Sequence, residues 1–108
     1  MPLDFTISIH YYGIRNPENH LDLFLDPGYE KPIVQYSCKI EDFRKKKKFQ
    51  MGVPHRRKYL SFSGEISGGR GRVRVLRRGS LEAPERFKDE NYPDRITLQL
   101  EDEYIIIS

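Results

Sequence analysis

The sequence has one cysteine, no long apolar run and no basic-then-apolar leader at its N-terminus. A single cysteine, Cys38, excludes an internal disulfide, so the fold does not require an oxidising compartment. No apolar segment approaches the roughly 20 residues that a membrane-spanning helix needs, and we therefore expect no membrane association. The opening MPLDFTISIH lacks the layout of a signal peptide, which predicts a cytoplasmic protein.

Aromatic and charged residues are plentiful by comparison. The 108 residues include seven tyrosines and six phenylalanines, and 32% of the chain is charged. The apolar residues fall in short bursts, which is typical of a folded domain with a polar surface and not of disorder. The length suits one compact domain, so we expect a single domain over residues 1–108.

The positive charge is unevenly distributed. The net charge is only +3, but most arginines and lysines lie between Arg44 and Arg78. A basic middle of this kind is typical of a protein that binds a polyanion such as nucleic acid. The run Lys45–Lys48 alone is equally typical of a solvated surface, so charge indicates a class of partner and no chemistry.

Period-two alternation of apolar and polar residues predicts a succession of short strands. The segment Glu41–Gln50 is left open between a helical turn and a basic loop, because its periodicity does not decide. Many short strands with closely spaced turns predict a mainly β fold, a compact antiparallel β-barrel with little helix. The expected strands are Phe5–His10, His20–Leu25, Ile33–Ile40, Lys58–Ile66, Gly71–Gly79 and two closing strands within Arg95–Ser108.

Polar groups with metal-binding chemistry gather on the first two expected strands. In HLDLFL the leucines share one side, while His20, Asp22 and Phe24 share the other. His10 ends the polar face of the preceding strand and would converge with His20 and Asp22 if the two strands pair. Two imidazoles and one carboxylate leave coordination positions open and suit Mn²⁺, Fe²⁺ or Zn²⁺, not Ca²⁺. A hydrogen-bonded surface pair in His-x-Asp is the alternative.

A second segment makes the pattern more specific. PHRRKYLSFSGEISGGRGRVRVLRRGSLE (Pro54–Glu82) places His55 four residues before Tyr59 and ends in a basic strand. Together with HLDLFLD (His20–Asp26), it resembles the 3′-phosphoesterase domain associated with bacterial DNA ligase D, and more closely its small stand-alone relatives. The resemblance covers Phe5 to Leu81.

This resemblance implies a β-barrel enzyme that works in DNA repair with Mn²⁺ or another divalent ion such as Zn²⁺ or Co²⁺. The family removes a 3′-phosphate or a terminal 3′-ribonucleotide, leaving a hydroxyl on DNA. The implied partners are DNA or RNA-tailed DNA 3′ ends, with a DNA ligase or polymerase in trans.

By position, the resemblance assigns His10, His20 and Asp22 as metal ligands. It implies that His55 contacts the scissile phosphate and that Tyr59 is the accompanying tyrosine. Phe24 stands where the ligase-attached domains carry a phosphate-binding arginine. The N-terminal arm that supplies further phosphate contacts in those domains has no counterpart in this sequence, and we expect other cations to make such contacts, the candidates being Lys39, Arg44, Arg56 and Arg70.

Two other functions remain open from the sequence. One is a nucleic-acid-binding barrel related to the enzyme but weak or inactive as a catalyst, which the missing arginine favours. The other is an Fe²⁺ oxygenase, because His-x-Asp with a distant histidine forms its ligand triad. His55 is the histidine that would complete that triad.

Overall fold

The part of the chain that the computed structural model describes contains eight strands and the 3-10 helix η2. The described residues are 2–11, 13, 19–28, 32–39, 46–66, 68–84, 87, 92–102 and 104–108. In chain order the elements are β1 (Pro2–Tyr11), β2 (His20–Leu25), β3 (Val34–Lys39), β4 (Lys46–Met51), the 3-10 helix η2 (Arg57–Leu60), β5 (Gly64–Glu65), β6 (Arg72–Glu82), β7 (Arg95–Leu100) and β8 (Ile105–Ile107).

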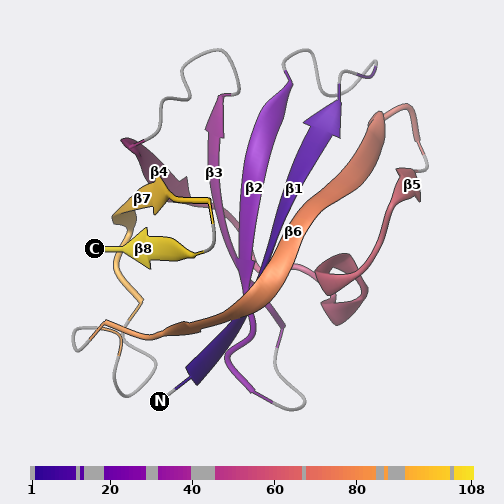
Figure 1. The fold of residues 1–108 in the computed structure, drawn as a ribbon. Helices are drawn as coiled ribbons and strands as arrows, with labels where there is room; N and C mark the ends of the chain where they lie inside the picture. Colours follow the sequence, from indigo (N-terminus) through magenta and orange to yellow (C-terminus); the bar gives the residue numbers. More distant parts are fainter. Residues whose placement is uncertain are drawn as a thin grey trace.

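All the strands join one antiparallel sheet in the order β5-β6-β1-β2-β3-β4-β7-β8. The sheet curls into a half-barrel, with the long β6 crossing in front of β1 and the β7–β8 hairpin at the opposite side (Figure 1). The mainly β, antiparallel barrel-like architecture expected from the sequence is therefore confirmed. Across the opening, Arg77 of β6 donates from Nη1 to the carbonyl oxygen of Glu101 at 2.9 Å, which ties β6 to the β7–β8 turn.

The main core fills the inner face of the curled sheet. The three leucines of β2 are at most 4% exposed and belong to this core, as the period-two alternation predicts. Burying one such side chain contributes about 2 kcal/mol, so the alternation fixes which face of β2 points inward. The other core positions come from every long strand and include Phe5, Ile7, Tyr36, Phe49, Leu81, Ile96, Leu98, Ile105 and Ile107.

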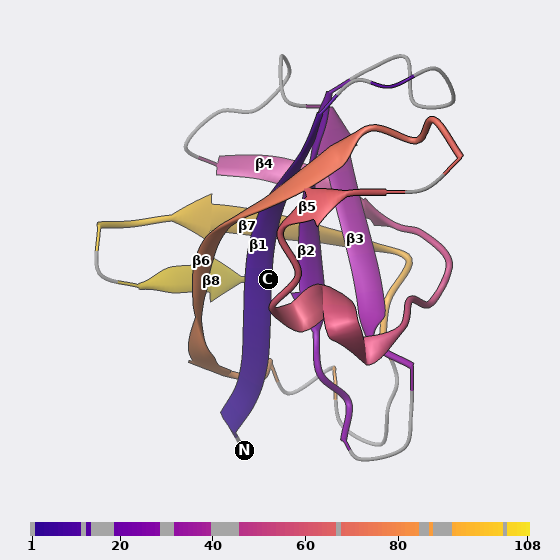
Figure 2. The same ribbon diagram turned by 90° about the vertical axis from the view of Figure 1, so that its right-hand side faces the viewer.

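The outer face of β1 and β2 is covered by a second, smaller cluster. Phe24 packs there with Ile33 and Tyr59, and the hydroxyl of Thr6 donates to the carbonyl oxygen of Leu60 at 2.5 Å. Figure 2 shows η2 and β5 lying over this face. Both faces of β2 are therefore covered; Asp22 is buried, whereas His20 at the start of the strand is partly exposed.

The structure corrects the sequence-based expectation in two segments. Lys46–Met51 forms β4, although neither of the expected alternatives for this region was a strand; Phe49 supplies its main apolar anchor, paired with Ile96 of β7. Lys58–Ile66 was expected as one strand but contains η2 followed by β5. Tyr59 and Phe62 pack edge-to-face at 5.6 Å, a three-residue spacing that suits a helical turn and not a strand.

None of the helical structure in the described residues has the length and apolar character needed to cross a bilayer.

Candidate metal centre and adjoining cavity

The pairing of β1 with β2 brings the three expected metal ligands to one face of the sheet. His10 lies directly opposite His20, and Ser8 lies directly opposite Asp22. Directly paired residues on antiparallel strands point to the same side, and alternation returns every second residue to that side. The convergence expected from the sequence therefore follows from the strand register.

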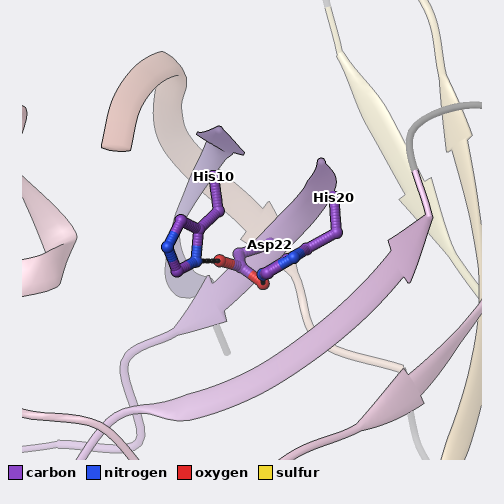
Figure 3. A group of neighbouring side chains, drawn as sticks. All are labelled: His10, His20 and Asp22. Carbon is purple, nitrogen blue, oxygen red and sulfur yellow. Dashed lines mark ion pairs between the residues drawn. The ribbon is translucent and has the colours of Figure 1, made fainter. Parts of the chain in front are cut away.

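Figure 3 shows the carboxylate of Asp22 between the two imidazole rings. Nδ1 of His10 is 4.0 Å from Oδ2 of Asp22, and Nε2 of His20 is 3.2 Å from Oδ1. One ligand atom from each residue lies within 4.8 Å of the others. Two atoms bound to one ion at about 2.1 Å lie at most about 4.2 Å apart, so small side-chain adjustments would let one ion contact all three groups.

The tautomer of His10 is set by its second ring nitrogen. Nε2 lies 2.6 Å from the carbonyl oxygen of Arg70, which accepts the N–H, so the Nδ1 lone pair faces Asp22. Burial lowers the pKa of His10 below its ordinary value of 6.5. The neighbouring imidazoles of His20 and His55 act in the same direction, whereas the Arg70 hydrogen bond and the Asp22 carboxylate act against it. The imidazole is therefore uncharged at neutral pH, the form that binds metal.

A close approach of two backbone segments holds the Arg70 carbonyl in place. Gly71 adopts a φ of 89°, and a Cβ on Gly13 would clash with the backbone of Gly71 and Arg70. The glycine-rich link thus lies against the end of β1, where its carbonyl reaches His10. Such a partner fixes a ligand's ring orientation and tautomer.

The donor set and its surroundings fit a metal ion. Asp22 is 2% exposed, which is unlike a carboxylate in a surface hydrogen-bonded pair, and two imidazoles with one carboxylate suit a divalent transition metal. Beside it, the hydroxyl of Ser8 is fully buried and has no hydrogen-bond partner among the described residues. A buried hydroxyl without a partner is costly and indicates a polar ligand or water at this face. His10, His20 and Asp22 can therefore hold a metal ion.

A cavity of about 320 Å³ opens beside this group. Its wall combines two of the three candidate metal ligands, His10 and Asp22, with His55 and Tyr59 from the second sequence segment. The lining residues are His10, Asp22, Phe24, Pro54, His55, Arg56, Tyr59, Ile66, Arg70 and Val73.

His55 is anchored to the sheet through its backbone. The N–H of His55 donates to the carbonyl oxygen of Ile33 at 3.1 Å, and the N–H of Ile33 donates to the carbonyl oxygen of His55 at 2.9 Å. Nδ1 of the ring donates a hydrogen bond to the carbonyl oxygen of Val53 at 2.8 Å. The ring nitrogen left for a ligand in the cavity is therefore Nε2.

Tyr59 and Phe24 form an aromatic wall next to His55. The Tyr59 ring stacks on Phe24 with centroids 6.1 Å apart and meets the His55 ring edge-to-face at 5.5 Å. Phe24 is 2% exposed and also contacts His55. Phe24 thus supports the cavity wall by packing, whereas an arginine at this position would offer charge.

Arg57 fastens this wall to the turn after β2. Its guanidinium donates to the carbonyl oxygen of Gly28 at 2.6 Å and to Oδ2 of Asp26 at 2.5 Å. The other carboxylate oxygen accepts from the N–H of Gly28 at 2.9 Å. These bonds close the Asp-Pro-Gly turn and hold the first residue of η2 against it.

We expect Arg57→Met to lower the free energy of unfolding by about 1 kcal/mol, since the pair is only partly buried. The hydrogen bond from Arg57 lowers the pKa of Asp26 below its ordinary 3.8. The stabilisation by this pair is therefore fully present above pH 3.8, the ordinary pKa, and is lost as the pH falls through the lowered pKa of the folded protein. Urea denaturation at neutral pH and at about pH 2 measures the difference, with Lys48→Met as the exposed control. An equal loss at both pH values would contradict the assignment.

The four cations that were expected to contact phosphate lie in different places. Arg56 and Arg70 are exposed and line the cavity. Lys39 ends β3 directly opposite His20, on the metal-ligand face but outside the cavity lining. Arg44 lies outside the described residues.

The sequence-based reasoning missed Gln35, which donates from Nε2 to Oδ1 of Asp22 at 2.9 Å. A signal was present, because Gln35, Ser37 and Lys39 alternate with apolar residues and form a polar face on β3. Which strand this face would meet depends on the strand order, which the pattern does not contain. The candidate metal-binding group consists of His10, His20 and Asp22. His55, the histidine that the oxygenase alternative would use, is not part of it.

Comparison of the chain with protein-family models, with curated proteins and with solved structures gave no match. The function is therefore inferred from the residues of the site.

Proposed function

We propose that the protein is a divalent-metal-dependent phosphoesterase that processes DNA 3′ ends, removing a 3′-phosphate or a terminal ribonucleotide. One observation carries the proposal. Two members of the group His10, His20 and Asp22, namely His10 and Asp22, line a cavity that His55 and Tyr59 also line. Metal ligands, a proton-exchanging imidazole and a phenol around one cavity are groups that can together catalyse phosphate-ester hydrolysis.

The resemblance of two sequence segments to the ligase D 3′-phosphoesterase domain supports the same activity. Those segments are far apart in the chain, and the residues singled out in them adjoin one cavity. We propose Mn²⁺ as the metal, because mixed nitrogen and oxygen ligands suit it and the resembling family uses it. Bound there, a divalent ion would polarise a phosphoryl oxygen and offset the charge that develops on it.

The chain's own residues account for the remaining steps. His55, with Nδ1 bonded to Val53, is placed to donate a proton from Nε2 to the leaving 3′ oxygen. The hydroxyl of Tyr59 is a donor for a non-bridging phosphate oxygen, while Arg56 and Arg70 attract the strand electrostatically. Water supplies the oxygen added to phosphorus, the P–O bond to the 3′ oxygen breaks, and the products are a 3′-hydroxyl and phosphate or a nucleotide.

A second candidate is a nucleic-acid-binding barrel without turnover. The packing of Phe24 favours it, since this side chain is buried under Tyr59 and supplies no charge where the ligase-attached domains have an arginine. Binding would then depend on the exposed arginines around the cavity.

The test is an end-processing assay on a 5′-labelled primer ending in a 3′-phosphate, a single ribonucleotide or a plain 3′-hydroxyl. We expect Mn²⁺-dependent conversion of the first two substrates to a 3′-hydroxyl end, and loss of conversion when the metal is chelated. Restoration by added Mn²⁺ is the control for irreversible damage. Binding of the primer without conversion at any metal concentration would contradict the phosphoesterase and favour the second candidate.

A further inference from the structure

We propose that Gln35 is a positioning residue that orients Asp22 for metal binding, and that Gly52 leaves the space its amide needs. The inference rests on the proposed function in one respect, the use of Asp22 as a metal ligand.

Gln35 reaches the site from the strand next to Asp22. It lies directly opposite Phe24 in the β2–β3 register, so its side chain starts on the face that carries His20, Asp22 and Phe24. From there Nε2 donates to Oδ1 of Asp22 at 2.9 Å. Gln35 is 9% exposed and Asp22 is 2% exposed, so water competes little for this hydrogen bond.

The hydrogen bond distinguishes the two oxygens of the carboxylate. Oδ1 is engaged by the Gln35 amide and lies near His20, whereas Oδ2 faces Nδ1 of His10 across 4.0 Å. Without the amide, the carboxylate can rotate about its terminal bond and pair with either imidazole. Partners of this kind, which hold a ligand rather than the metal, change metal affinity by about 10–100-fold.

Gly52 controls where the Gln35 amide can lie. Its N–H donates to the carbonyl oxygen of Gln35 at 2.9 Å, and a Cβ at this position would clash with Oε1 of the Gln35 side chain. The clashing atom is the far end of a flexible side chain, so alanine at Gly52 displaces the amide and leaves the backbone where it is. Two substitutions, one buried and one on an exposed residue, thus break the same hydrogen bond.

The experiment measures Mn²⁺ affinity of the whole chain by electron paramagnetic resonance, for Gln35→Met, Gly52→Ala and the double variant. Each single substitution is expected to weaken binding by about 10–100-fold. The double variant is expected to bind no more weakly than the worse single variant, because both remove one interaction. Gln50→Met, at an exposed position of β4, is the matched control and should bind as the wild type does.

A purely structural role for Gln35 would lower thermal stability in Gln35→Met and leave Mn²⁺ affinity unchanged. Unchanged affinity in either single variant, or losses that multiply in the double variant, would overturn the inference and leave the proposed function standing. A wild-type protein that binds no Mn²⁺ would overturn both, so the two failures are distinguishable.

Discussion

Asp22→Asn is expected to abolish Mn²⁺ binding and to reduce 3′-end processing by about 10³-fold, the loss of several kcal/mol of charge stabilisation. The amide has nearly the same shape as the carboxylate, and its oxygen can still accept from Gln35. The fold should therefore persist. What disappears is the negative charge that two neutral imidazoles alone do not supply.

The matched control is Asp102→Asn, which removes the same charge from an exposed residue at the β7–β8 turn. Mn²⁺ titration followed by calorimetry measures the affinity, and the primer assay measures the rate. Full processing activity by Asp22→Asn would show that the reaction does not use this carboxylate.

His55→Gln is expected to lower kcat by about 10²–10⁴-fold while Mn²⁺ affinity stays at the wild-type value. The two backbone hydrogen bonds to Ile33 do not depend on the side chain, so the segment keeps its position. Glutamine is polar and similar in reach, but it does not exchange a proton near neutral pH. The substitution should therefore slow the chemical step and leave the metal affinity unchanged.

Two measurements separate the role of His55 from that of Asp22. The primer assay should show a lower kcat for His55→Gln than for the wild type, and a Mn²⁺ titration should give the wild-type affinity. A variant that loses metal binding together with activity would instead place His55 among the ligands, as the oxygenase alternative from the sequence requires.

The sequence predicts the part of the site that depends on strand alternation. In β2 the leucines enter the main core, and the polar residues meet on the other face. Because β1 and β2 are consecutive strands, their antiparallel pairing places His10 opposite His20. Strands that are consecutive in the sequence are often adjacent in space, so this contact can be predicted from the sequence pattern.

The parts that the sequence did not predict depend on contacts between distant segments. Tyr59 lies in a helical turn because it packs on Phe24, and the lysine-rich β4 is a strand because it pairs with β7. The hydrogen bond from Gln35 likewise needs the position of β3 beside β2. Tertiary pairing decides each of these, and local periodicity is weak there.

The central claim is that His10, His20 and Asp22 bind one divalent cation at the wall of the cavity. Anomalous X-ray scattering from crystals soaked in Mn²⁺ tests it most directly. We predict a single strong manganese peak in contact with Nδ1 of His10, Nε2 of His20 and a carboxylate oxygen of Asp22. Crystals saturated with Mn²⁺ that show no peak among these three residues would contradict the account.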